Sequence, residues 1–348
     1  MKKRSRTFVI HSSNPYAAAA AMGMAVARNE SSGNYFDPIS GPMPGAQPDP
    51  LAQHQSSVPF TADPMLKVDF RADWADFIRR DMTAYGLTFR QSRTLEENTD
   101  RYLNAKRRIP RRSARTIHES KELCIPPQYA NDYSALTKLI REGGDLKPYL
   151  SRDIAKKKSS DKNDPLLNRD GIQHLHFRRR GSDDVLFAKI TDTDVFVIQA
   201  LPHDDPQVWV NTSLLQILHD NWPETAEGRV AGIPPEPLPA SERLALQYRN
   251  RNFATAMSDG AVYLSPGGGV IESGQCYDDR VASDRIFGYL ADWQRVAQDN
   301  AVNLRAALGI PFPEELALNL KFENEDWWRV PILYAPIKQA KVSLSRGG

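Results

Sequence analysis

The sequence predicts an α+β protein, with a central antiparallel sheet packed with helices, a mainly helical C-terminal region and a flexible N-terminal tail. Residues 171–201 hold three β-rich runs separated by turn residues, and helical patterns lie on both sides of this stretch. The composition fits a folded globular chain, because 41% of the 348 residues are hydrophobic and 25% are charged. A chain of this length can bury one large core or two.

The predicted sheet is a three-stranded meander. Residues 171–178 alternate apolar and polar side chains, and the runs 185–190 and 195–201 are rich in Val, Ile, Leu and Phe. Residues 191–194, Thr-Asp-Thr-Asp, have the composition of a tight turn, so the last two runs are expected to form a hairpin.

Helices are expected before and after the meander. Apolar residues recur at helical spacing over 70–85, and the amphipathic stretch 134–141 is closed by two glycines. After the meander, 212–222 carries an apolar stripe, and 283–308 is expected to be the longest helix.

Three regions follow from the composition along the chain. Residues 1–66 combine a basic start, an Ala-rich stretch and many Pro and Gly residues, which predicts a flexible tail and linker. Residues 67–225 form the expected basic α+β domain. Residues 240–348 form an acidic, mainly helical region, after a proline-rich connection over 228–240.

The hydropathy of the chain and its two cysteines bear on where the protein is found. No apolar run approaches the roughly 18 residues that a transmembrane helix needs, so no membrane partner is expected. Cys124 and Cys276 lie far apart and form no Cys-x-x-Cys motif. Free thiols of this kind are typical of the reducing cytoplasm, which is the predicted location.

The net charge of +2 conceals an uneven distribution of charge. Residues 1–180 hold 31 basic and 20 acidic side chains, whereas residues 181–348 hold 14 basic and 23 acidic ones. The basic half could bind nucleic acid, or the two halves could neutralise each other within one chain, across a homo-oligomer or against a protein partner.

A dense basic block lies between Arg101 and Leu123. Its closely clustered members could follow the phosphates of RNA, with binding that weakens as the salt concentration rises. The candidate nucleic-acid-binding residues are Lys106, Arg107, Arg108, Arg111, Arg112 and Arg115.

Histidines concentrate around the predicted meander. His174 and His176 lie two residues apart on its first strand, so their side chains and that of Arg178 should share one face of the sheet. His203 follows the third strand, and His219 lies 16 residues further on. Such a density of histidines predicts a functional site.

Three interpretations of these histidines remain open. The first is metal-independent cleavage of RNA without a cofactor, in which His174 or His176 is the base, His203 the acid and Arg178 the phosphate clamp. The second is a hydrolase with one transition metal bound by His174, His176 and Asp205, or with Asp204 or His203 completing the set. The third is that one imidazole satisfies a buried hydrogen bond and the other faces solvent.

The order of elements over residues 134–222 resembles the core of RelE-type ribonuclease toxins. The resemblance rests on the run Leu186-Phe187-Ala188-Lys189-Ile190, a short turn, the strand 195–201 and the terminal His203. It implies a compact ribonuclease fold with His174, His176 and Arg178 on the strand that faces the substrate. It further implies a nuclease or RNA-binding protein of toxin or antiviral defence type. A phage- or defence-associated interaction protein without catalytic activity is the alternative.

Overall fold

The computed structural model describes residues 7–12, 63–151, 162–179, 181–232, 234, 237–323 and 327–346. Within these residues the α+β class is confirmed, since the chain contains both helices and the strands of three separate sheets. Most of the predicted tail and linker over 1–66 lies outside the described residues. One part of it is a strand, β1 (Thr7–Ser12), which pairs with the last strand of the chain and was not predicted.

The chain divides into two compact units, which are described separately. The first unit contains residues 1–77 and 286–348, and the second contains residues 78–285. This division differs from the predicted one, which began a new region at residue 240. The physical reason is that Met257, Ala261 and Tyr263 pack into the core of the central sheet and therefore belong with it.

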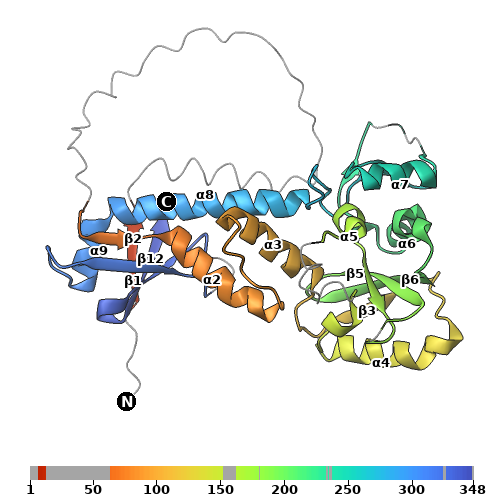
Figure 1. Cartoon of the computed structure of the whole chain (residues 1–348), viewed down its shortest axis with the longest axis horizontal. Coiled ribbons are helices and arrows are strands. Elements are labelled where there is room, and N and C mark those ends of the chain that lie inside the picture. Colours follow the sequence, from red (N-terminus) through yellow and green to blue (C-terminus); the bar gives the residue numbers. More distant parts are fainter. Residues whose placement is uncertain are drawn as a thin grey trace, which may run out of the picture. The chain divides into compact units, whose positions relative to one another are not determined.

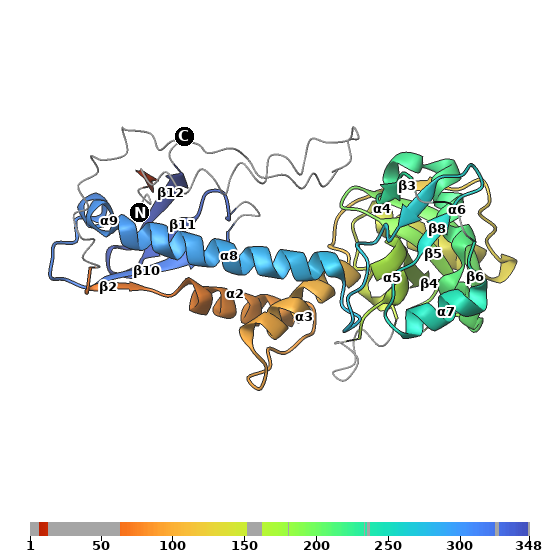
Figure 2. The same cartoon turned by 90° about the horizontal axis from the view of Figure 1, so that it is seen from above.

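The first unit is built on a mixed five-stranded sheet with the order β1-β12-β11-β10-β2. Its strands after β1 are β2 (Leu66–Val68), β10 (Leu316–Lys321), β11 (Ile332–Ala335) and β12 (Ala340–Arg346). Its helical parts are the start of α2 (Phe70–Ala84), the later part of α8 (Tyr277–Asp299) and α9 (Ala301–Leu308). The C-terminal region thus contains more strand than expected (Figures 1 and 2).

The second unit holds the predicted meander in a four-stranded sheet with the order β3-β6-β5-β4. The meander strands are β4 (Gln173–His176), β5 (Asp184–Ile190) and β6 (Asp194–Pro202), and β5 pairs antiparallel with both β4 and β6. The predicted turn is present, because the backbone N–H of Thr191 donates to the carbonyl of Asp194 at 2.9 Å. The fourth strand, β3 (Thr116–Glu119), comes from the end of the basic block and runs parallel to β6.

Both faces of this sheet are covered, which explains the nearly continuous apolar sequences of β5 and β6. Val185 and Phe187 face a core that includes three leucines of α6 (Thr212–Asn221). Leu186 and Ala188 face the opposite core, which includes Leu136 and Ile140 of α4 (Ala130–Arg141). Figure 1 shows α4 along the sheet.

Shorter elements complete the second unit. Helix α3 (Leu95–Arg108) begins at Thr94 with a capping box to Glu97, which fixes the start of the basic block as a helix. The other helices are α5 (Pro165–Asp170) and α7 (Ala240–Tyr248). A small sheet has the order β7-β9-β8, with β7 (Arg229–Val230), β8 (Ala254–Ala256) and β9 (Val262–Leu264). Within the described ranges, every helix is too short or too polar to cross a membrane.

Candidate catalytic site

The structure brings three of the predicted histidines together. The rings of His174 and His176 have centroids 6.0 Å apart, and those of His176 and His203 are 5.3 Å apart. One ring nitrogen of each histidine lies within 4.8 Å of one nitrogen of each of the other two. Three imidazoles at this spacing can contact one small group at the same time.

The strand register explains why these residues meet. His176 pairs with Val185 of β5, and Val185 pairs with Leu201 of β6, so the three residues form one row across the sheet. His203 lies two residues beyond Leu201, and its backbone N–H continues the ladder by donating to the carbonyl of Asp183 at 2.7 Å. Because side chains alternate along a strand, His203 projects from the same face as His174 and His176.

An aromatic wall borders the cluster. Trp209, from the short helical turn η6 (Pro206–Val210), contacts His174 with ring centroids 4.9 Å apart and His203 with centroids 5.4 Å apart. The same Trp209 lines a cavity of about 370 Å³ together with Asp164, Asp204 and Tyr248. Tyr248 is 76% exposed, and Trp209 is the residue that this cavity shares with the surroundings of the histidines.

His174 is held in an environment that favours its neutral form. Burial lowers its pKa below the usual value near 6.5, the carboxylate of Asp164 acts in the opposite direction, and His203 and Arg108 lower the pKa further. Its Nδ1 is buried and has no hydrogen-bond partner. An unsatisfied buried nitrogen is costly, so this feature argues against a purely structural role for His174.

The hydrogen bonds of His176 fix its tautomer. The backbone N–H of Ser182 donates to Nδ1 of His176 at 3.1 Å, so the proton of the neutral ring is on Nε2. Histidine ligands of metals normally show the reverse pattern, in which the nitrogen away from the metal donates a hydrogen bond. His176 therefore does not fit a metal ligand, and its Nε2–H is a hydrogen-bond donor.

The alternative metal set of His174, His176 and Asp205 is not assembled. The carboxylate of Asp205 caps the turn η6 by accepting from the backbone N–H of Gln207 at 2.8 Å. His203 takes the third place in the cluster instead. Nδ1 of His203 lies 3.7 Å from the almost fully exposed carboxylate of Asp204.

Arg178 does not join the histidines, which corrects the predicted phosphate clamp. Strand β4 ends at His176, and the chain bends before Arg178. The guanidinium of Arg178 forms an ion pair with Asp132 at 2.7 Å and lies over the ring of Tyr129, 5.0 Å from its centroid. Tyr129 belongs to the core on the α4 side, so Arg178 lies on the opposite face of the sheet.

Three arginines of the basic block form hydrogen bonds and ion pairs within the fold. Arg107 forms an ion pair with Asp279, Arg108 is buried and donates to the carbonyl of Lys162, and buried Arg115 donates to the carbonyl of Thr191. Desolvation lowers the pKa of Arg115. These three arginines are not available as a surface that follows phosphates.

The other candidates in the block lie nearer the surface. Arg112 is largely exposed and forms an ion pair with Asp145. The ammonium of Lys106 lies over the ring of Tyr102, 5.4 Å from its centroid, and Arg111 has an exposed side chain. The exposed part of the predicted phosphate-binding surface is therefore smaller than the sequence suggested.

His219 has a structural role. It is buried, with Nδ1 2.9 Å from the hydroxyl of Tyr263 and Nε2 3.1 Å from the carboxylate of Asp259. The sequence pattern does not single out Trp209, although it lies only six positions after His203. A tryptophan beside a cluster of histidines was the available signal.

In comparisons with protein-family models, curated proteins and solved structures, no match to this chain was found. Function is therefore argued from the chemistry of the site.

Proposed function

We propose that His174, His176 and His203 form the acid–base centre of a metal-independent endoribonuclease of toxin or defence type. The observation that carries the proposal is the tautomer of His176, which makes its Nε2 a donor rather than a metal ligand. The resemblance of residues 134–222 to RelE-type toxins agrees with this choice. The free thiols of Cys124 and Cys276 suit action in the cytoplasm.

Each histidine has a distinct role in the proposed reaction. Neutral His174 accepts the proton of a ribose 2′-hydroxyl, whose oxygen then forms a bond to the adjacent phosphorus. The bond from phosphorus to the 5′-oxygen breaks, and His203 gives its proton to that oxygen. The Nε2–H of His176 donates to a non-bridging phosphate oxygen as negative charge develops. The products are a 2′,3′-cyclic phosphate and a 5′-hydroxyl.

The aromatic wall gives the substrate a place to bind. A base next to the cleaved bond can stack on Trp209 or Tyr248, which line the cavity beside the cluster. The carboxylates of Asp164 and Asp204 in the same cavity disfavour additional phosphates there. A single-stranded RNA that reaches the site with one phosphate fits this charge distribution better than a duplex.

The test is cleavage of end-labelled single-stranded RNA by the purified full chain, with and without EDTA. Cleavage should yield cyclic phosphate ends, persist in EDTA and stop when the 2′-hydroxyl at the cleaved position is replaced by hydrogen. His174→Ala and His203→Ala should each slow cleavage by about 100-fold or more. His118→Gln is the matched control, since His118 lies outside the cluster, paired with Asp194.

Two results would refute the proposal. One is a folded wild-type protein that leaves RNA intact under all metal conditions. The other is an activity that EDTA removes and a transition metal restores, which would favour the hydrolase alternative.

A further inference from the structure

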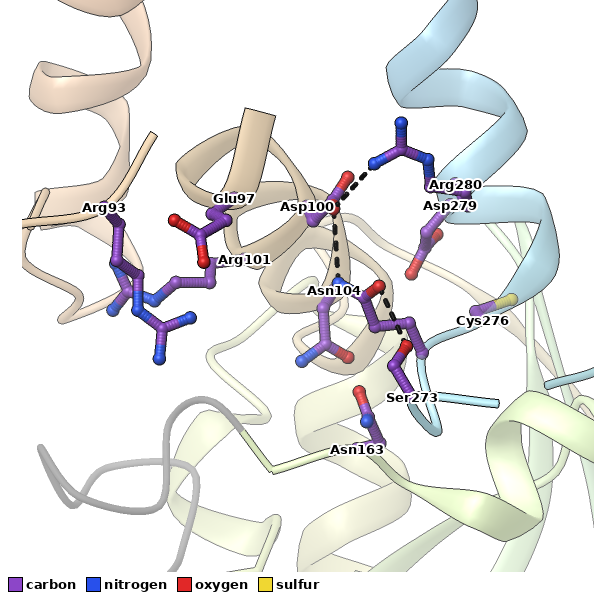
Figure 3. A pocket seen from close by; sticks show the side chains of 11 residues that line it. Arg93, Glu97, Asp100, Arg101, Asn104, Asn163, Ser273, Cys276, Asp279 and Arg280 are labelled. Carbon is purple, nitrogen blue, oxygen red and sulfur yellow. Dashed lines mark hydrogen bonds and ion pairs between the residues drawn. The ribbon is translucent and has the colours of Figure 1, made fainter. Parts of the chain in front are cut away.

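A second, polar pocket lies in the same unit between α3 and the segment that leads into α8. It has a volume of about 450 Å³ and is lined by side chains from both elements, among them Asp100, Asn104, Gln275 and Arg280 (Figure 3). None of the three clustered histidines lines it. It is therefore a separate site from the catalytic centre proposed above.

Two buried acceptors in this pocket lack donors. Asp100 and Asn104 lie one turn apart on α3, and each is 8% exposed. The Oδ1 atom of Asp100 and the Oδ1 atom of Asn104 are both buried and accept no hydrogen bond. Buried acceptors without donors are costly, so the pocket suits a ligand that donates to both.

Two donors lie next to these acceptors. The other carboxylate oxygen of Asp100 accepts from Nη1 of Arg280 at 3.3 Å and from Nε2 of Gln275 at 3.2 Å. Figure 3 shows Arg280 bonded to Asp100, with Asn104 further along the same helix. A ligand that donates to both acceptors and accepts from Arg280 or Gln275 would satisfy these groups.

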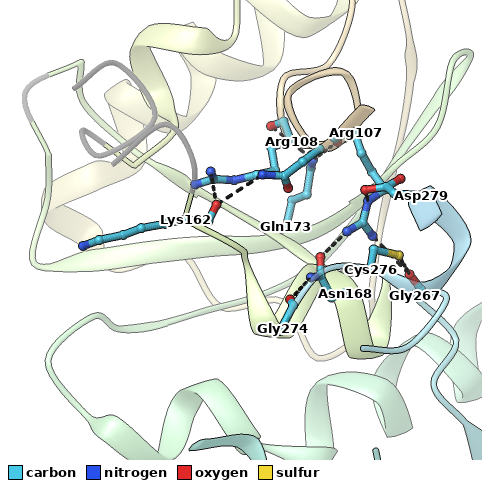
Figure 4. A network of polar contacts seen from close by, with 10 residues as sticks. Arg107, Arg108, Lys162, Asn168, Gln173, Gly267, Gly274, Cys276 and Asp279 are labelled. Atoms are coloured by element: carbon cyan, nitrogen blue, oxygen red, sulfur yellow. Dashed lines mark hydrogen bonds and ion pairs between the residues drawn. The ribbon is translucent and has the colours of Figure 1, made fainter. Parts of the chain in front are cut away.

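The walls of the pocket are fixed in position by a polar network centred on Arg107 (Figure 4). Arg107, on α3, donates to Asp279 and to the carbonyl of Gly267, both at 3.1 Å, and also to Asn168. Asn168 in turn donates to the carbonyl of Gly274 at 3.2 Å. These contacts tie α3 to the segment opposite it, so the acceptors and donors are held in register before a ligand binds.

We propose that this pocket binds a guanine base. The Watson–Crick edge of guanine presents the acceptor O6 beside the donors N1–H and N2–H, which matches in number the two free acceptors and a neighbouring donor. O6 accepts from Arg280 or Gln275, N1–H donates to Asp100 and N2–H donates to Asn104. Adenine would place its N1 lone pair against the Asp100 carboxylate and is rejected.

A metal ion does not explain the same acceptors. Among the described residues, the group of His, Cys, Asp and Glu with the spacing of a metal site is the histidine cluster. The pocket also contains the guanidinium groups of Arg93, Arg101 and Arg280, which balance its three carboxylates. A neutral base with donors and an acceptor fits this charge balance better than a cation does.

The test measures binding of GMP, IMP and AMP to the full chain by isothermal titration calorimetry. IMP lacks only the N2 amino group, so it should bind about tenfold more weakly than GMP, and AMP should show no binding. Asn104→Ala should weaken GMP to the level of IMP and leave IMP unchanged, because the lost contact is the one that IMP does not make. Asn221→Ala, outside the pocket, is the control.

A second arm distinguishes a free nucleotide from a guanine in RNA. It compares the binding of a short oligoribonucleotide that contains one guanine with that of the same strand carrying inosine at that position. Cleavage is prevented by the choice of pH or by use of the His174→Ala variant. Preference for guanine in the oligoribonucleotide alone identifies RNA as the source of the base. Equal binding of GMP and AMP, or no guanine preference in either arm by folded protein, overturns the proposal. The comparison of GMP, IMP and AMP uses the unmodified protein, so it tests the proposal even if Asn104→Ala fails to fold. It also does not depend on whether the protein cleaves RNA.

Discussion

Replacing Arg107 with alanine separates its role in the fold from the role that the sequence suggested. Arg107 and Asp279 have side chains that are 20% and 15% exposed, and their ion pair is 3.1 Å long. The same guanidinium donates to the carbonyl of Gly267 and to Asn168. Arg107→Ala therefore removes three hydrogen bonds and leaves a largely buried carboxylate without its partner. A loss of about 3–5 kcal/mol in the free energy of unfolding is expected.

The loss should depend on pH with a definite sign. Burial already raises the pKa of Asp279, and the nearby charge of Arg107 opposes that rise. Without Arg107 the pKa of Asp279 in the folded state rises further. The destabilisation should therefore be largest at pH 8, where the buried carboxylate must ionise, and smaller as the pH falls and the folded state takes up the proton.

Urea unfolding at pH 5.5 and pH 8 measures both effects. Arg107→Ala combined with Asp279→Asn should recover part of the stability at pH 8, because no buried charge remains. Arg112→Ala is the matched control: its side chain is 72% exposed, and a change of at most about 0.5 kcal/mol is expected. If Arg107→Ala left stability unchanged at both pH values but weakened RNA binding, Arg107 would be a phosphate contact and the structural argument would be refuted.

Three further predictions concern the second unit. Because burial lowers the pKa of His174, the unfolded chain binds a proton here at a higher pH than the folded chain does, so stability should fall as the pH drops from 6.5 through the folded-state pKa; His174→Gln should flatten the stability profile over this range in urea unfolding. Gly267→Ala would place a Cβ against the carbonyl oxygen of Leu167, so thermal unfolding should show a loss of about 1–3 kcal/mol, whereas Gly288→Ala in α8, with open space around its Cβ and no positive φ, should not destabilise the fold. Phe187→Ala removes a fully buried ring between the sheet and α6 and should cost about 3–5 kcal/mol by urea unfolding, and an unchanged midpoint would place Phe187 outside the core.

Local patterns were enough to predict the meander and the meeting of the histidines. Alternation of side chains places His174 and His176 on one face, and the Thr191–Asp194 turn sets the register that brings His203 beside them. Arg178 shares their parity in the sequence, but the strand ends before it. An ion pair with Asp132, 46 residues earlier in the chain, then determines its position. Sequence spacing cannot predict such a non-local partner.

The basic block is a second case in which sequence spacing alone does not predict the position of side chains. A cluster of arginines predicts a positive surface only if the arginines remain in solvent. Whether they do depends on which backbone carbonyls and carboxylates the fold brings to them. Arg107 meets Asp279 across 172 positions of sequence, and Arg280 meets Asp100 across 180. Pairs at such separations lie outside any local pattern.

These two ion pairs join the basic half of the sequence to the acidic half. Arg107 and Asp100 belong to the basic half, whereas Asp279 and Arg280 belong to the acidic half, and all four lie within one unit. Charges from the two halves of the sequence therefore pair with each other inside this unit, at or near the walls of the polar pocket. The backbone carbonyl of Arg107 accepts from Nε2 of Gln173, the residue directly before His174. The helix that carries the guanine-binding acceptors is thus bonded to the strand that carries the proposed base, which gives the two sites a direct physical connection.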